Sequence, residues 1–383
     1  MAIKKRKDRD VMTSLKLGMG MLRLPVFDGD DSRVNHEKTN ELVDAFLSSG
    51  YNYFDTSYVY HGGKSEEATR KCVVERHPRE SFTVTSKFPT FFLYQKEDPE
   101  TIFQKQLKNC AVEYFDYYLL HNVNETLYDD VIEKYDLFGF IKGKKEAGLV
   151  KNIGFSFHDR PELLDRMLSE HPEVDFVQIV VNYFDWTSCW VRSKECYEVI
   201  RKHGKKVIIM EPVKGGMLAH PPKELADKMQ KIDPGMSPAS WAFRFLADLD
   251  GVIAVLSGMS TLEQVQENTK LLKNITPLNA AEKQMLIDSA PAYRKMGPLG
   301  KENFDEYKGV AKNGMPVEKV LEVYNTWKLE TSMGVGANAD TCYYRSEMYR
   351  AGVEGSWVTE PIFDKEGNDI TELLKEAEKI LFQ

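Results

Sequence analysis

Cysteine is scarce in this sequence, and the residues that occur are spread along the whole chain. The five cysteines, Cys72, Cys110, Cys189, Cys196 and Cys342, include no CxxC pair. We therefore predict neither a cysteine-rich metal site nor a disulfide framework. Few and dispersed thiols are typical of a reducing compartment, so we expect a cytoplasmic protein without a bound metal.

Long apolar runs and an excess of positive charge are also missing. No segment reaches the about 20 apolar residues that a membrane helix needs, and no apolar region of a signal peptide follows the basic stretch KKRK near residue 5. The 383 residues include 51 lysines and arginines against 59 aspartates and glutamates, a net charge of -8. This sign disfavours nucleic acid as a partner. We expect neither nucleic-acid nor membrane binding, and the oligomeric state stays open.

The glycine pattern of doubly wound nucleotide-binding sheets is incomplete. Residues 18–23, GMGMLR, lack the third glycine of GxGxxG, which disfavours that fold. Instead, β-rich runs, several of them apolar throughout as in strands buried on both faces, alternate with helical stretches. The predicted strands are 15–20, 52–55, 82–87, 114–121, 152–156, 176–181, 206–210 and 251–256. Eight parallel strand–helix units in this length predict an α/β fold, a closed (β/α)8 TIM barrel.

The pattern changes after the eighth unit. Residues 276–383 contain several prolines, helical stretches at 317–327 and 370–380, and a Gly/Asn-rich piece at 333–338. We therefore predict a barrel domain over residues 1–275 and a mostly helical C-terminal extension over residues 276–383.

Four polar residues stand at the ends of three successive predicted strands, where barrel active sites lie. Asp55 ends the second strand and Tyr60 follows it, Lys87 ends the third, and His121 ends the fourth. An ammonium beside a phenol lowers the phenol pKa from about 10. Asp55 would keep Lys87 charged, and His121 could orient a carbonyl group. The four residues therefore predict proton transfer at a carbonyl.

This arrangement resembles the aldo-keto reductase signature, an Asp with a Tyr five residues later and then Lys and His at the next two strand ends. The resemblance covers about residues 13–272 and implies a TIM barrel with NAD(P)H extended across its rim. It also implies reduction of a small aldehyde or ketone by hydride transfer, with Tyr60 as the proton donor. The substrate's identity cannot be predicted from the sequence.

The resemblance further implies where the cofactor binds. The loop after the seventh strand would hold the pyrophosphate through backbone N–H groups beside its glycines. The implied contacts, from the nicotinamide to the adenosine, are Gly20, Met21, Asp55, Ser156, Gln178, Met210, Pro212, Val213, Lys214, Gly215, Gly216, Ser257, Gly258, Gln264, Glu267 and Asn268. NADPH-preferring members present Lys or Arg near Gly258 and Gln264. Neither is basic here, which leaves the choice between NADP and NAD open.

The extension is similar to a ferredoxin-like module that some family members carry, through the segment 312–327. Such modules bind iron–sulfur clusters through cysteines, but the extension contains only Cys342. We expect no iron–sulfur cluster and interpret the extension as a degenerate module, with an unrelated helical cap as the alternative.

A second function also stays open. Barrels of this family can serve as cofactor-binding regulatory or interaction subunits with little turnover, and the extension would then be a docking module. The complete set of Asp55, Tyr60, Lys87 and His121 favours the enzyme, because a sensor needs no proton donor.

Overall fold

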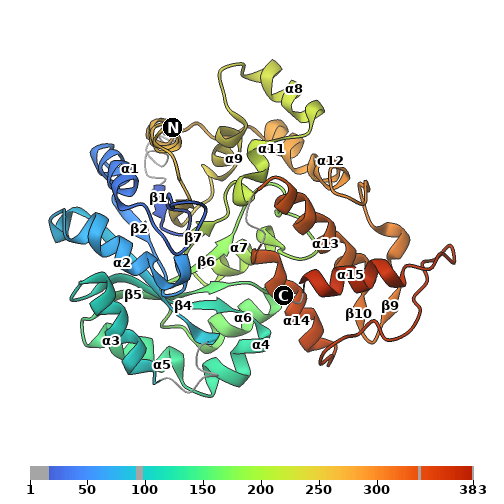
Figure 1. The fold of residues 1–383 in the computed structure, drawn as a ribbon, viewed down its shortest axis with the longest axis horizontal. Coiled ribbons are helices and arrows are strands. Elements are labelled where there is room, and N and C mark those ends of the chain that lie inside the picture. The colour runs from blue at the N-terminus through green and yellow to red at the C-terminus, as the bar shows by residue number, and fades with distance from the viewer. Residues whose placement is uncertain (1–16, 92–97, 335–337, 382–383) are drawn as a thin grey trace, which may run out of the picture.

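The predicted TIM barrel is confirmed by the computed structural model, which describes residues 17–91, 98–334 and 338–381 (Figure 1). Eight parallel strands pair in chain order, and the last pairs with the first to close the barrel. The strands are β1 (Leu17–Gly20), β2 (Tyr53–Asp55), β3 (Thr83–Phe88), β4 (Phe115–Val123), β5 (Val150–Phe157), β6 (Phe176–Val180), β7 (Lys206–Met210) and β8 (Val252–Ser257).

The apolar runs seen in the sequence form these strands because both of their faces are covered. Val177, Ile208 and Val255, for example, have no exposed surface, as expected where helices cover the outside and side chains fill the interior. The strand β4 runs two residues beyond the prediction, past a register shift between Leu120 and Val123.

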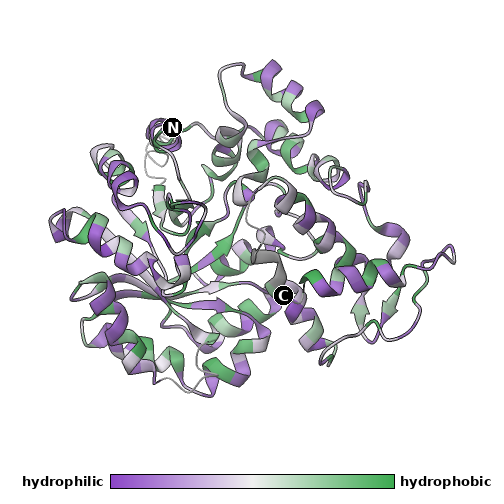
Figure 2. Cartoon of the chain, in the orientation of Figure 1, coloured by the Kyte–Doolittle hydropathy of each residue, from purple (hydrophilic) through white to green (hydrophobic). Residues whose placement is uncertain are grey.

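Helices cover the outside of the barrel and turn an apolar stripe toward it (Figure 2). Side-chain caps stabilise the N-termini of several of these helices. Asn35 accepts a hydrogen bond from the Lys38 amide, and Thr261 and Gln264 form a capping box. The barrel helices are α1 (His36–Ser48), α2 (Ser65–Thr69), α3 (Pro99–Cys110), α4 (Glu125–Leu127), α5 (Leu137–Glu146), α6 (Pro161–Glu170), α7 (Ser193–Lys202), α8 (Lys223–Ile232), α9 (Pro238–Leu246) and α10 (Leu262–Lys273).

The C-terminal part is mostly helical and lies against one side of the barrel (Figure 1). It comprises α11 (Ala280–Ile287), α12 (Ala290–Lys295), a hairpin of β9 (Ala311–Lys312) and β10 (Met315–Pro316), α13 (Val317–Ser332), α14 (Asn338–Arg350) and α15 (Thr371–Leu381). Leu286 and Tyr293, from α11 and α12, pack into the barrel core. A second core around Trp357 and Leu374 joins α13, α14 and α15. The domain boundary after residue 275 therefore stays a prediction.

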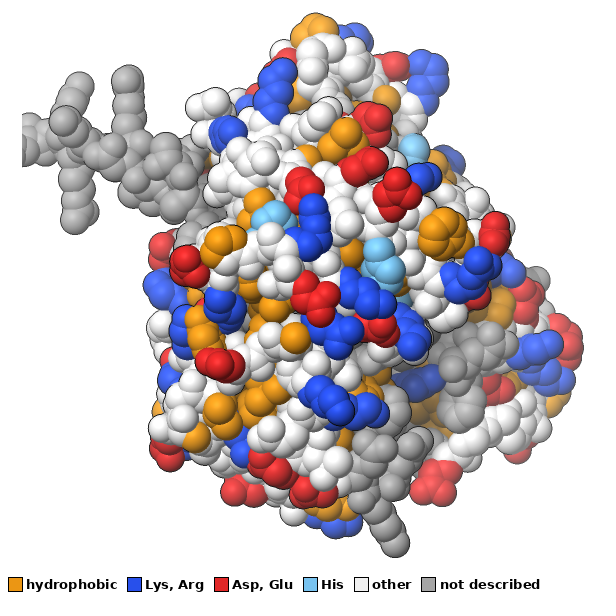
Figure 3. Space-filling model, turned by 60° about the vertical axis from the view of Figure 1, so that its left-hand side comes forward, with side chains coloured by type: hydrophobic (Ala, Val, Ile, Leu, Met, Phe, Trp, Pro, Cys, Tyr) orange, Lys and Arg blue, Asp and Glu red, His pale blue; other side chains and the backbone are white. Residues whose placement is uncertain are grey.

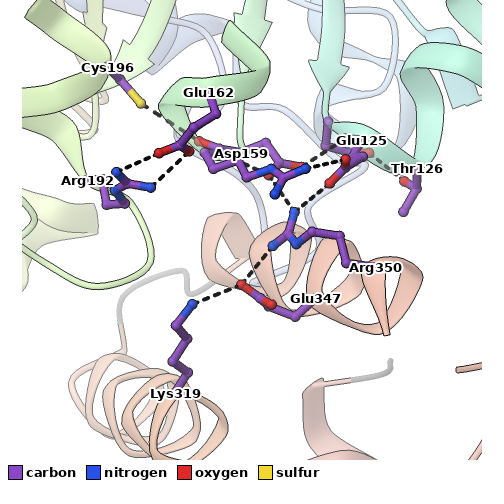
Figure 4. A network of polar contacts seen from close by, with 11 residues as sticks. Glu125, Thr126, Asp159, Glu162, Arg192, Cys196, Lys319, Glu347 and Arg350 are labelled. Carbon is purple, nitrogen blue, oxygen red and sulfur yellow. Dashed lines mark hydrogen bonds and ion pairs between the residues drawn. The ribbon is translucent and has the colours of Figure 1, made fainter. Parts of the chain in front are cut away.

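Charged contacts fix α14 to the barrel rim (Figure 4). Arg350 donates to Glu125 at 2.8 Å and to Asp159 at 2.9 Å, beyond the ends of β4 and β5. Glu347 accepts from Lys319 of α13 at 3.2 Å. The extension is thus attached at the end of the barrel where the strands terminate, which is the end that carries active sites in this fold.

The outer surface is mixed in charge. Figure 3 shows acidic and basic side chains interspersed on one face. Among the helices of the described residues, none combines the length and the apolar character needed to cross a bilayer.

Candidate active site

The four residues predicted from the strand ends meet at the mouth of the barrel. Lys87 Nζ donates to Asp55 Oδ2 at 2.5 Å and to the Thr56 carbonyl at 2.8 Å. The same ammonium lies 4.7 Å from the centre of the Tyr60 ring. The rings of Tyr60 and His121 meet edge to face with their centres 5.8 Å apart. The structure thus brings all four side chains together.

A tight turn after β2 positions Tyr60. The 3-10 turn of Tyr60–Gly63 begins at Tyr60, and the next residue, His61, has a φ of 54°. The His61 ring holds this strained turn, because its Nε2 accepts from the Leu24 amide at 3.1 Å and its Nδ1 lies 2.9 Å from the Asp31 carbonyl. The loop after β1 is thereby fixed to the segment that carries Tyr60.

Burial sets the protonation of Tyr60 and Lys87. Burial raises the pKa of Tyr60, and the positive charge of Lys87 opposes this shift. Lys87 acts in the direction that the sequence predicted, but burial outweighs it, so the phenol keeps its proton at neutral pH. Burial has the largest single effect on Lys87 and lowers its pKa, but Asp55 and Tyr60 together raise the pKa above the ordinary lysine value. The lysine therefore stays charged.

His121 is a neutral imidazole. Burial, followed by the charge of Lys87 and the proximity of His158, lowers its pKa well below the ordinary value. Its Nδ1 lies 3.2 Å from Ser57 Oγ. With the Ser57 hydroxyl as donor to Nδ1, the proton of the ring sits on Nε2, which is then a hydrogen-bond donor. The sequence reasoning gave Ser57 no role, although it stands two residues after Asp55.

A cavity of about 380 Å³ adjoins Asp55 and Tyr60. It runs from the end of β1 past the ends of β6 and β7 to the start of α10. Most of the predicted cofactor contacts line it: Gly20, Asp55, Gln178, Met210, Pro212, Val213, Gly215, Gly216, Ser257, Gly258, Gln264, Glu267 and Asn268. Gly215 and Gly216 have φ values of 64° and 117°, which glycine adopts without strain.

Comparison with known proteins identifies the fold's family. A family model described as the aldo/keto reductase family matches residues 16–290. The chain belongs to this family. The predicted resemblance is confirmed, and with it the prediction of an NAD(P)-dependent oxidoreductase.

Individual relatives of this aldo/keto reductase are distant. It is 23% identical over 261 residues to the uncharacterized oxidoreductase YqkF of Bacillus subtilis, covering 60% of this chain and 81% of that one. It is 24% identical to the methylglyoxal reductase DkgA of Salmonella typhimurium, covering 68% of this chain and 84% of that one.

Solved structures show the same fold. The aldo-keto reductase AKR11C1 of Bacillus halodurans, in its holo form, has a TM-score of 0.58 at 21% identity, covering 73% of this chain and 95% of that one. An aldo-keto reductase of Klebsiella pneumoniae in complex with NADPH has a TM-score of 0.57 at 15% identity, with coverages of 73% and 96%.

Three predicted cofactor residues do not line the cavity of the reductase. Met21 is packed in the barrel core, and its amide donates to the Asp55 carbonyl at 2.8 Å. Ser156 is buried, and its Oγ accepts from the Asn122 amide at 2.8 Å. Lys214 turns away from the cavity into the protein. Burial by neighbouring segments, which the sequence pattern does not show, accounts for all three.

Lys214 instead joins the loop that carries Gly215 and Gly216 to the extension. Its Nζ lies 3.0 Å from Asp185 Oδ2 and 3.3 Å from Glu330 Oε1, and all three residues are buried. Glu330 belongs to α13. The loop that carries Gly215 and Gly216 is therefore held in part by a residue from beyond the barrel.

The extension also reaches the neighbourhood of His121. Cys342 of α14 donates through Sγ to Asn122 Oδ1 at 3.1 Å, directly after His121 in the chain. The rings of Tyr343 and His158 have their centres 6.4 Å apart. The centre of the Phe91 ring lies 6.2 Å from that of His121. Side chains of α14 thus contact Asn122 and His158, close to the imidazole.

The described residues contain no group of three or more His, Cys, Asp and Glu side chains arranged to hold a metal ion. The cavity does contain residues that sequence reasoning missed, among them Arg23, Glu211 and Ser237. Arg23 stood in the glycine segment 18–23, and no pattern indicated that its side chain would reach the cavity.

Proposed function

We propose that this aldo/keto reductase reduces small aldehydes or ketones to alcohols with NADPH or NADH. The observation that carries the proposal is the buried Lys87–Asp55 ion pair beside Tyr60 at the wall of a cavity. Two similar proteins support it: the Salmonella protein is a methylglyoxal reductase, and the Klebsiella structure is a complex with NADPH.

The cavity suits a nicotinamide dinucleotide. Gln178 is buried at the cavity wall, and its Oε1 has no hydrogen-bond partner among the described residues. The amide N–H of a nicotinamide carboxamide would satisfy this acceptor. At the other end, Gly215 and Gly216 have no side chains, so a pyrophosphate could approach the backbone N–H groups there.

In the proposed reaction the bound nicotinamide supplies a hydride to the carbonyl carbon. Tyr60 gives its hydroxyl proton to the carbonyl oxygen, so that one hydride and one proton yield the alcohol. Lys87 stabilises the resulting phenolate, and Asp55 keeps Lys87 charged. The neutral His121 donates from Nε2 to the carbonyl oxygen and orients it. Water then returns a proton to Tyr60.

The test is steady-state oxidation of NADPH and of NADH with a panel of aldehydes and ketones, for the native chain and for Tyr60→Phe. We expect turnover by the native chain and a loss of at least about 100-fold in kcat for the variant. Tyr135→Phe is the matched control, because Tyr135 is exposed and does not line the cavity. Full activity of Tyr60→Phe would reject the mechanism.

The alternative of a cofactor-binding regulatory subunit predicts a different result in the same assays: tight NAD(P)H binding by the native chain with no turnover on any carbonyl. The cytoplasmic location and the lack of nucleic-acid and membrane partners remain predictions from the composition.

A further inference from the structure

Arg23 is the single Lys or Arg among the described residues that line the cofactor cavity. It lies in the loop after β1, a segment that also supplies Gly20 to the cavity wall. Lys214, the cation that the sequence placed at the cofactor, is absent from this lining and is paired with Asp185 and Glu330. Among the described residues of this lining, Arg23 is therefore the side chain that can offer a positive charge to a ligand.

The guanidinium of Arg23 has no hydrogen bond, ion pair or ring contact with the residues that the structure describes. The other arginines in the same ranges each have at least one such contact, as Arg350 does with Glu125, Asp159 and Glu347. Arg23 is also only partly exposed. A half-buried cation with five donors and no partner at a cavity wall is arranged to receive an anion.

The position of Arg23 is tied to Gly258. A Cβ at position 258 would lie 2.9 Å from Arg23 Cδ and 3.1 Å from its Cγ, closer than such atoms pack. The glycine therefore leaves room for the arginine stem across the end of β8. A lysine at 258 would compete with the arginine stem for this space, so Arg23 would have to shift to make room for it.

Two other described side chains near this end of the cavity, Gln264 and Lys270, are less suited to bind an anion. Gln264 is committed to the cap of α10, where its Oε1 accepts from the Ser260 amide at 2.8 Å. Lys270 does not line the cavity.

Two carboxylates of the cavity lie near Tyr60, away from Arg23, and a third accepts a hydrogen bond from a serine. Asp55 and Glu211 act electrostatically on Tyr60, which places them at the reacting end. Glu267 accepts a hydrogen bond from Ser237. Arg23 instead packs on Gly258, at the end where the adenosine is expected.

Resting on the proposed function, we propose that Arg23 binds the 2′-phosphate of NADPH and makes the reductase selective for NADPH over NADH. The planar guanidinium forms paired charge-assisted hydrogen bonds with a phosphate, which is dianionic near neutral pH. The same contact is missing for NADH, whose ribose carries a hydroxyl at this position.

The experiment measures the dissociation constants of NADP⁺ and NAD⁺ by titration calorimetry for the native chain, Arg23→Met and Arg23→Lys. We expect Arg23→Met to weaken NADP⁺ binding by about 10- to 100-fold and NAD⁺ binding by less than about 3-fold. Arg23→Lys keeps the charge without the fork and should show an intermediate loss. Arg166→Met, which removes an exposed arginine of α6, is the matched control and should change neither constant.

A double variant tests the exchange between the two positions. Arg23→Ala removes the arginine side chain that packs against position 258, and Gly258→Lys supplies a cation directly after β8. The affinity for NADP⁺ should then return to within about 10-fold of the native value. Equal losses of NADP⁺ and NAD⁺ affinity in Arg23→Met would assign Arg23 to the pyrophosphate and overturn the inference, and so would unchanged affinities. Failure of the native chain to bind either nucleotide would instead overturn the proposed function.

Discussion

The contact between Lys214 and Glu330 predicts that the C-terminal extension controls cofactor binding. The perturbation is Glu330→Gln, which removes one carboxylate charge and keeps the size of the side chain. Lys214 and Glu330 are 3.3 Å apart, with 6% and 4% of their side chains exposed. Solvent therefore screens this ion pair little. Without the ion pair, the loop that carries Gly215 and Gly216 is held less firmly.

The magnitude follows from what remains after the substitution. Breaking a buried ion pair by removing one partner costs about 3–5 kcal/mol when the other charge is left alone. Here Asp185 stays 3.0 Å from the ammonium, so the lost interaction is closer to one hydrogen bond to a charged group, about 1.5–3 kcal/mol. We expect the free energy of unfolding to fall by about 2 kcal/mol.

The assay combines urea denaturation with cofactor titration. Glu330→Gln should weaken binding of both NADP⁺ and NAD⁺ by several-fold, because the loop that faces the pyrophosphate is less well held. The control is Glu376→Gln, which removes a half-exposed partner of Lys328 and should cost less than about 1 kcal/mol. The reasoning is refuted if Glu330→Gln behaves like the control, or if it loses stability while both affinities stay native.

Three further predictions concern the reacting groups. Lys87→Met should lower kcat at least about 100-fold and the free energy of unfolding by about 3–5 kcal/mol, since Asp55 is left buried without its partner; turnover and urea denaturation check this, and native turnover would contradict it. Because burial raises the pKa of Tyr60 and lowers that of His121, the kcat of reduction should stay level from pH 6 through neutrality and decline only in alkali; a decline centred near the ordinary histidine value would instead report His121. Burial lowers the pKa of His158 to about 4, so as the pH falls His158 is protonated in the unfolded chain before it is protonated in the folded one. The free energy of unfolding should therefore fall by up to about 3 kcal/mol as the pH drops from about 6.5 toward 4. Denaturation of His158→Gln should show a shallower fall in this range.

The strands and the clustering of Asp55, Tyr60, Lys87 and His121 could be predicted because their signals are local. Runs such as 176–181 are apolar throughout, and Asp55, Lys87 and His121 stand at strand ends, which a barrel brings to one rim. The observed strand ends differ from the predicted ones by one or two residues, for example at β4, which continues past a register shift to Val123.

The rest of the site depends on contacts between distant segments. Lys214 looked like a phosphate ligand because it flanks two glycines, but Asp185 and Glu330 from two other segments draw its ammonium inward. Arg23 looked like part of an incomplete glycine motif, and its place beside Gly258 follows from the pairing of β1 with β8. Neither contact leaves a pattern in one sequence.

Hydride transfer from the nicotinamide to the substrate is tested most directly by following the hydrogen that reaches the carbonyl carbon. The native chain is incubated with an aldehyde or ketone that it turns over and with NADPH carrying deuterium at both C4 positions, and the alcohol is analysed by mass spectrometry and NMR. We predict one deuterium on the former carbonyl carbon of the alcohol. An alcohol without that deuterium, or no alcohol from any carbonyl offered, would contradict it.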